Sequence, residues 1–129
     1  MLNDFNISDV ETLFADKVRE IGVSANVWNN RPKAVSDTIG DFAVVKVTGG
    51  ITDKAAFGEC RVSVQLFARD IKEMKNSKKL SVMQERLYTI PLWIEPLLLD
   101  GHPRIVGDTP DDFGFHARFI NFRVYIKII

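Results

Sequence analysis

The chain is poor in the side chains that disulfides and most metal sites require. It has one cysteine, Cys60, and two histidines, His102 and His116. One cysteine cannot form an intrachain disulfide, and none of the three residues stands in a spacing typical of a zinc site. Cys60 falls on the apolar side of an alternating segment, so we interpret it as a small buried hydrophobic residue rather than a nucleophile. This cysteine usage suits a reducing cytoplasm.

Motifs of catalysis are missing as well. There is no G-x-S-x-G nucleophile elbow and no glycine-rich phosphate loop. Asp108, Asp111 and Asp112 carry oxygen atoms, but their spacing is not that of an EF-hand calcium loop, and we interpret this segment as a loop between strands. We therefore predict that the protein is not an enzyme, and we expect no catalytic, cofactor-binding or metal-binding residue and no cofactor.

Neither an excess of one charge nor a long hydrophobic run is present. The 17 Lys and Arg residues balance 17 Asp and Glu residues, whereas dedicated nucleic-acid binders usually have a basic excess. No apolar stretch approaches the roughly 20 residues of a membrane span, and residues 1–15 lack the apolar core of a secretion signal. With 129 residues, 46% of them hydrophobic, we expect one soluble domain over 1–129 that does not contact membranes.

The clearest positive signal is the alternation of side chains in residues 115–129. One face would carry the apolar residues Ile120, Phe122, Val124, Ile126 and Ile128. The other face would carry a mixed set, namely Ala117, Phe119, Asn121, Arg123, Tyr125 and Lys127. A period of two predicts a long β-strand with these two faces. Residues 60–67 alternate in the same way.

The first part of the chain predicts a helix followed by three strands. Apolar residues at helical spacing predict a helix over about Asp9–Ile21, which begins at a capping box of Ser8 and Glu11. Gly22 is a plausible left-handed stop. Residues 23–27 form a short strand, and 42–47 and 59–69 are expected to be antiparallel partners. We predict a turn at 48–50 and a longer hairpin arm over 49–58.

The second part predicts another helix and further strands. Asn76 or Ser77 caps a helix with one apolar stripe, and Pro91 ends it. Residues 93–99 form a strand or a pinned segment, and 104–106 form a short strand before an acidic loop over 107–114. Taken together, the order α-β-β-β-α-β-β predicts an α+β fold. We expect a mostly antiparallel sheet of four to six strands with two helices packed on one face.

Two surface features suggest binding. One is a group of basic residues that would form either a patch for nucleic acid or an acidic partner, or a solvated connector and helix face. These residues are Arg69, Lys72, Lys75, Lys78, Lys79 and Arg86.

The other feature is apolar. Aromatic residues on the mixed face of the last strand, with Trp28 and two residues of the arm, would form an apolar rim suited to subunit contacts. The alternative is that helices cover both faces of the sheet. The interface candidates are Ile51, Phe57, Phe119 and Tyr125.

The layout resembles that of a phage family. A capped helix leads to a short Val-Trp strand, a Phe-Ala-Val-Val-Lys-Val strand with a long arm, and the run Val-Ser-Val-Gln-Leu-Phe-Ala-Arg at 62–69 before the second helix. This pattern is similar to the tail terminator (tail completion) proteins of long-tailed phages and prophages, and to related minor tail and head–tail joining proteins. The stretch over 91–112 and the absence of a short polar tail depart from that pattern.

The resemblance implies a structural role in virion assembly. The subunits would form a ring, commonly a hexamer, that caps the tail tube and meets the head–tail connector. The arm would reach a neighbouring subunit, and DNA would pass through the ring without tight binding. The protein would be present in the host cytoplasm during assembly and then in the virion tail.

Two hypotheses of other classes stay open. The first is a small ligand-binding or enzymatic α+β domain, with a pocket lined by Trp93, His116 and Tyr125. The second is a nucleic-acid-binding accessory protein that uses the basic region Arg69–Arg86 and binds in a salt-sensitive way.

Overall fold

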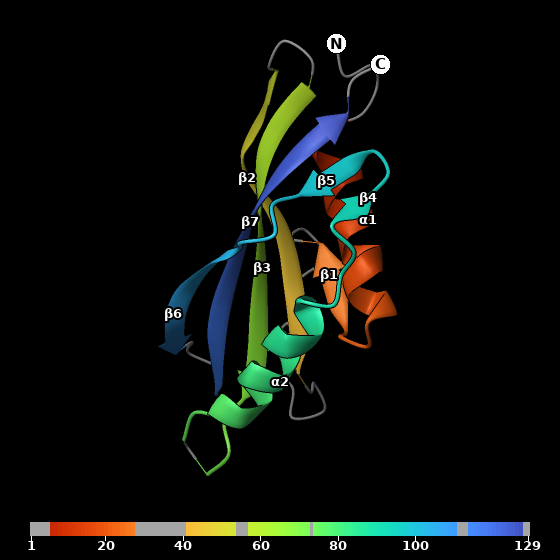
Figure 1. The fold of residues 1–129 in the computed structure, drawn as a ribbon. Coiled ribbons are helices and arrows are strands. Elements are labelled where there is room, and N and C mark those ends of the chain that lie inside the picture. The colour runs from red at the N-terminus through yellow and green to blue at the C-terminus, as the bar shows by residue number, and fades with distance from the viewer. Residues whose placement is uncertain (1–5, 28–40, 54–56, 73, 111–113, 128–129) are drawn as a thin grey trace.

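The computed structural model describes residues 6–27, 41–53, 57–72, 74–110 and 114–127. Trp28, the loop up to Gly40, Asp111 and Asp112 lie outside these residues. The elements in chain order are α1 (Ile7–Glu20), β1 (Ala25–Val27), β2 (Phe42–Asp53), β3 (Phe57–Arg69), α2 (Ser77–Leu87), β4 (Trp93–Ile94), β5 (Leu97–Leu99), β6 (Arg104–Pro110) and β7 (Phe115–Lys127) (Figure 1). Among the described residues, no helix is long and apolar enough to cross a membrane.

All seven strands belong to one sheet, in the order β1-β2-β3-β7-β5-β4, and β6 pairs with β7. Among the strand pairs of the described residues, the short β1–β2 pair alone is parallel. The predicted α+β class, with a mostly antiparallel sheet, is therefore confirmed. The predicted pairing of β2 with β3 is confirmed too, since Phe42 lies opposite Phe67 and Val47 opposite Val62.

The centre of the sheet is the β3–β7 ladder. These two strands pair from Phe57–Lys127 at one end to Arg69–Phe115 at the other, over the full thirteen residues of each. The other edge of β7 is shared by β5, opposite 124–126, and β6, opposite 116–121. The predicted final strand therefore lies inside the sheet and carries three neighbours.

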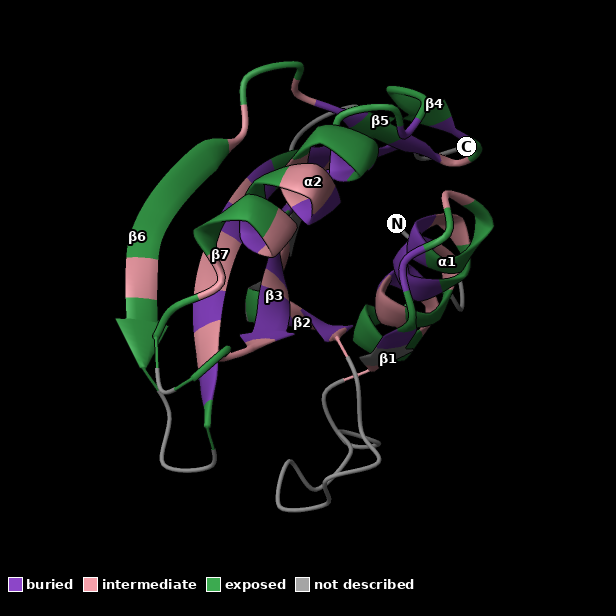
Figure 2. Ribbon diagram, turned by 90° about the horizontal axis from the view of Figure 1, so that it is seen from below, coloured by how far each residue is buried: buried purple, intermediate pink, exposed green. Residues whose placement is uncertain are grey.

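Both helices cover the same face of the sheet, as predicted. Val10, Phe14 and Val18 of α1 belong to one buried cluster with Leu80, Met83 and Leu87 of α2. The apolar side of β7 faces this cluster, because Ile120, Phe122, Val124 and Ile126 are all part of it. In Figure 2 the buried surfaces of α1 and α2 are turned toward β2, β3 and β7. The apolar side chains that alternate along β7 and those that recur at helical spacing on α1 and α2 therefore pack in one core.

The start of α1 differs from the prediction. The capping box consists of Asn6 and Asp9, not Ser8 and Glu11: the Asp9 N–H donates to Asn6 Oδ1 at 3.1 Å, and the Asn6 N–H donates to Asp9 Oδ2 at 2.8 Å. Both pairs have the same three-residue spacing, so the sequence pattern does not distinguish them. Glu11 instead accepts the Val47 N–H at 2.9 Å and links α1 to β2. Gly22 has the predicted left-handed conformation, with φ +89°.

The predicted turn at 48–50 is wrong. β2 continues through this segment to Asp53, with a register shift between Thr48 and Thr52. A glycine pair inside a strand marks a bulge as readily as a turn. The arm is therefore a continuation of the β2–β3 ladder, and Figure 1 shows this end of the sheet extending above both helices.

A smaller cluster covers part of the opposite face, which we call the open face because neither helix packs on it. Phe42 stacks on Phe67 with ring centroids 4.8 Å apart, and Phe115 meets Phe42 edge-on at 5.5 Å. Phe119 packs against this cluster, and the Arg69 guanidinium lies 4.5 Å from the Phe115 ring centroid. The predicted mixed face of β7 is thus apolar near its start and polar farther along.

The main core makes Phe14 a sensitive position. Its ring is fully buried and lies 5.3 Å from that of Phe122, so it joins α1 to β7. We expect Phe14→Ala to lower the free energy of unfolding by about 3–5 kcal/mol, measured by urea denaturation. Leu92→Ala, at a side chain that is 51% exposed, should cost less than about 1 kcal/mol. Equal losses in both variants would contradict this account of the core.

Candidate binding surfaces

The four predicted interface residues do not gather in one patch. Phe57 and Tyr125 contact each other edge-on, with centroids 5.4 Å apart, and Phe57 remains 38% exposed. Ile51 is half-buried and packs against the main core. Phe119 is half-buried against the open-face cluster. Phe57 is exposed, whereas Ile51, Phe119 and Tyr125 are all half-buried, and the four residues stay predicted interface candidates.

The residues of the hypothetical pocket are not brought together. Trp93 and Tyr125 lie in one row of the sheet with Leu98 between them. His116 is nine residues from Tyr125 on β7, which corresponds to roughly 30 Å along an extended strand. There His116 Nδ1 lies 2.6 Å from Asp70 Oδ1. These side chains cannot line a common site.

The basic region Arg69–Arg86 is partly neutralised by local partners. Lys75 Nζ lies 3.1 Å from Asp108 Oδ2, and Lys79 Nζ lies 3.5 Å from Asp41 Oδ2. The Arg86 guanidinium donates to the Gly22 carbonyl oxygen at 3.3 Å. These contacts join Lys75, Lys79 and Arg86 to neighbouring elements of the fold.

Asp108 forms an ion pair that holds β6 against α2. Arg118 donates from Nε and Nη2 to the two Asp108 carboxylate oxygens, at 2.7 and 3.0 Å. The Arg118 Nη1 group also donates to Gln84 Oε1 at 2.9 Å and to Ser81 Oγ at 3.2 Å on α2. The hydrogen bonds from Arg118 and Lys75 hold the pKa of Asp108 below its usual value. The predicted acidic loop is therefore wrong up to Pro110, where it forms the end of β6.

Cys60 is buried in the main core, as the sequence interpretation expected. Burial, with a smaller effect from the charge of Glu59, raises the pKa of its thiol to about 11. Because the thiolate is the reactive form, this environment suppresses reactivity. Its position supports packing rather than chemistry.

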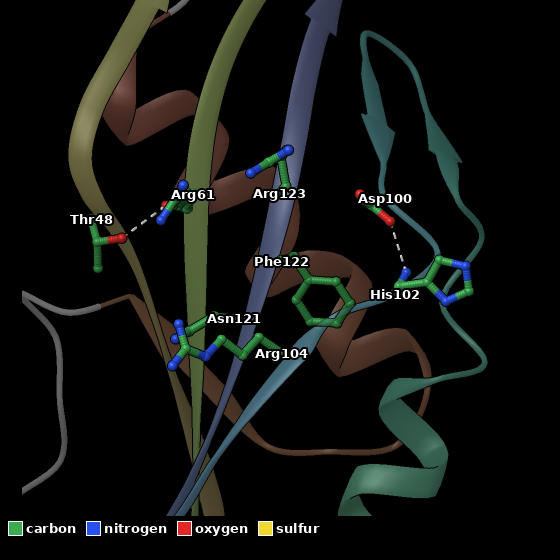
Figure 3. Close-up of a pocket in the computed structure, with 8 residues that line it drawn as sticks. All are labelled: Thr48, Arg61, Asp100, His102, Arg104, Asn121, Phe122 and Arg123. Carbon is green, nitrogen blue, oxygen red and sulfur yellow. Dashed lines mark hydrogen bonds between the residues drawn. The ribbon is translucent and has the colours of Figure 1, made fainter.

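A hollow of about 410 Å³ lies over β7 where β5 ends and β6 begins. Its lining includes three arginines, Arg61 of β3, Arg104 of β6 and Arg123 of β7 (Figure 3). The carboxylate of Asp100 also lines it, together with Thr48, His102, Asn121 and Phe122. Arg123 Nε lies 3.3 Å from Glu59 Oε1, and contact with Tyr125, followed by the charge of Glu59, raises the pKa of Arg123 above its usual value. The hollow can accommodate an anion.

Sequence reasoning did not identify this hollow. Its arginines come from three strands and are separated by more than 40 and by 19 positions along the chain, so no local spacing connects them. Arg61, Arg104 and Arg123 each fall in a predicted strand, but no pattern in the sequence connects the three strands at these residues. The three arginines lie close together because of the register of the strands, and this register depends on the pairing of the whole sheet.

Apolar side chains are also exposed at one edge of the sheet. β6 is exposed over nearly its whole length, and Ile105 and Val106 are 46% and 39% exposed (Figure 2). Within the described residues, β6 pairs only with β7, so its outer edge has no strand neighbour. Trp93 and Leu98 of the β4–β5 hairpin are exposed as well.

Removal of the Asp108 charge should destabilise the protein in a pH-dependent way. The folded pKa lies below the unfolded value near 4, so the stabilisation is complete at neutral pH and is lost as the pH falls through the folded pKa. We expect Asp108→Asn to lower the free energy of unfolding by about 1–3 kcal/mol at pH 7 and by less near pH 3, measured by denaturation. Asp16→Asn, in an exposed pair with Arg19, should cost less than about 1 kcal/mol. A pH-independent loss in Asp108→Asn would contradict the assigned role.

The Cys60 thiol should be inert in the folded protein. Its raised pKa lowers the thiolate fraction at neutral pH by about a hundredfold relative to an ordinary cysteine. We expect slow labelling by a thiol-reactive dye in buffer and complete labelling in denaturant. Cys60→Ala with Lys78→Cys, which moves the thiol to an exposed helix position, should label rapidly in both. Rapid labelling of the folded wild type would contradict burial.

Comparison with known proteins adds evidence on the fold only. No protein-family model matches the chain, and no curated protein matches it. Nineteen chains of solved structures match. One of them aligns with 95% of this chain and 93% of its own length, with a TM-score of 0.54 and 12% sequence identity. At this identity the likeness supports a shared architecture across the whole domain and carries no information on activity or partners.

Proposed function

We propose that this chain is a structural virion-assembly subunit of the tail terminator type. Its subunits form a ring, in the simplest case a hexamer, that caps the tail tube and joins it to the head–tail connector. The protein acts in the host cytoplasm during assembly and then in the virion tail. The proposal rests on the sequence resemblance and on the exposed β6 edge, which is the observation that carries it.

The β6 edge suits contact with another subunit. Unpaired backbone groups at a sheet edge can pair with another chain, and soluble proteins usually protect such edges. Here the edge carries exposed Ile105 and Val106 between the exposed Arg104 and the bulge at Gly107. The opposite edge of the sheet is the short strand β1, so the two edges differ. Contact between unlike surfaces is head-to-tail, and it closes into a ring when the rotation permits.

The end of the β2–β3 ladder supplies a second contact surface in this proposal. Phe57 and Tyr125 meet there, and Figure 1 shows this end extending beyond the helices. It would reach a neighbouring subunit or the tail-tube protein. In such a protein the function lies in shape and contact, so no catalytic residue is required.

Light scattering across a concentration series tests the ring. We expect the wild type to approach a discrete species of about six times the 14.6 kDa chain mass. Replacing both edge residues, Ile105→Lys with Val106→Lys, should shift the protein to monomer, because two charges would have to be buried in the contact.

Met74→Lys provides the matched control, since Met74 is 71% exposed but lies outside the sheet edge. It should assemble as the wild type does. A wild type that stays monomeric at high concentration and also fails to bind a tail-tube protein would refute the proposal.

A further inference from the structure

Two arginines face each other across the central ladder on the open face. Arg61 of β3 and Arg123 of β7 are register partners, and Arg104 of β6 lies opposite Asn121, two residues along β7. Figure 3 shows the three arginine side chains extending toward the same side of the sheet, with Arg104 beside Asn121. Like charges directly opposite on neighbouring strands destabilise a sheet. This arrangement therefore costs stability in the absence of a counter-charge.

Acidic side chains balance only part of this charge. Glu59 contacts Arg123. Asp100 lines the hollow, where its charge acts on Arg123 and its Oδ1 accepts the His102 backbone N–H at 2.9 Å. Among the described residues, no carboxylate pairs with Arg61 or Arg104, and both are exposed. The hollow is thus positively charged in a chain whose formal net charge is zero.

The contrast with the region around α2 is informative. There Lys75, Lys79 and Arg118 each have a carboxylate partner within the fold. The unpaired arginines gather instead on the face of the sheet that the helices leave open. Thr48 helps to fix this side of the hollow, since its hydroxyl donates to the Arg61 carbonyl oxygen at 3.4 Å.

We propose that this hollow binds phosphate groups, either of a free nucleotide or of a nucleic-acid backbone. A guanidinium group presents paired N–H donors that match two phosphate oxygens, and Asn121 adds a neutral amide. The volume of about 410 Å³ falls within the range of small-molecule sites, roughly 300–1,000 Å³.

Phosphate groups place more negative charge in a small volume than the carboxylates of an acidic peptide do. A single carboxylate brings one negative charge, whereas a nucleotide or nucleic-acid strand places several phosphate charges close together. The three arginines stand against two carboxylates, Glu59 and Asp100, so one positive charge of the hollow is left for a ligand to balance. A salt-sensitive contact of this kind is compatible with a ring through which DNA passes without tight binding, but it stands independently of that role.

The test compares ligands and variants at low and moderate salt, about 50 and 200 mM. A labelled single-stranded oligothymidylate is titrated by fluorescence anisotropy, and ATP and a polyglutamate peptide are titrated by calorimetry. We expect saturable binding of a phosphate ligand that weakens with salt. Arg61→Gln with Arg104→Gln should weaken this binding at least about tenfold and reduce its salt dependence.

Lys72→Gln with Lys78→Gln is the control, because it removes the same charge from exposed positions near α2. It should bind as the wild type does, and thermal unfolding should show that both double variants are folded. Binding of the oligonucleotide alone would identify a nucleic-acid backbone as the ligand, and binding of one ATP per chain would identify a nucleotide. The proposal is overturned if no phosphate ligand binds, if the arginine variant binds normally, or if polyglutamate binds equally well, which would indicate an acidic protein partner.

Discussion

The β3–β7 ladder is the constraint on which the rest of the structure depends. Thirteen consecutive register pairs hold these strands together, and a shift of one residue would move every side chain of a strand to the other face. Such a shift would turn Ile120, Phe122 and Val124 of β7 away from the helices. The same register places Arg61 opposite Arg123 on the open face. The register of β3 against β7 therefore determines both the packing of the core on one face and the position of the charged hollow on the other.

The edge of the sheet is organised by a local irregularity. The register of β6 against β7 shifts between Val106 and Asp108, with Gly107 as the extra residue. A bulge changes which face the following side chain points to. Val106 lies opposite Phe119 on the open side, whereas Asp108 reaches Arg118 on the side of α2. The ion pair thus attaches an otherwise exposed strand to the body of the domain, while its outer edge stays accessible.

The two faces of the sheet have different roles. The helices remove one face from solvent and supply most of the buried apolar surface, which is the main stabilising contribution in a domain of this size. Among the residues that the structure describes, the open face has a small aromatic cluster, and beside it lie arginines, asparagine and threonine. Stability is thereby concentrated on one side, and the other side and the β6 edge are available for contacts.

Local patterns were sufficient for the class of fold. Alternation in 60–67 and 115–127, with the stripes of the two helices, predicted an α+β fold with both helices on one face, because these periodicities depend only on neighbouring residues. They did not decide between Asn6 and Ser8 as the cap of α1, or between a turn and a bulge at Gly49 and Gly50. In each case two local solutions satisfy the same pattern, and packing selects one. The Glu11 carboxylate, for example, accepts a hydrogen bond from the Val47 N–H and does not take part in the capping box at the start of α1.

What the sequence by itself determined is therefore the type and approximate extent of the long elements, the burial of Cys60 and the absence of recognisable catalytic motifs. Only the tertiary structure decided which polar residues meet. Arg61, Arg104 and Arg123 come from three strands, and Asp108 reaches Arg118 only through a bulge. The physical reason is that strand pairing is non-local: the register of residues far apart in the chain is set by the fit of the whole core, and the side chains on the other face follow it.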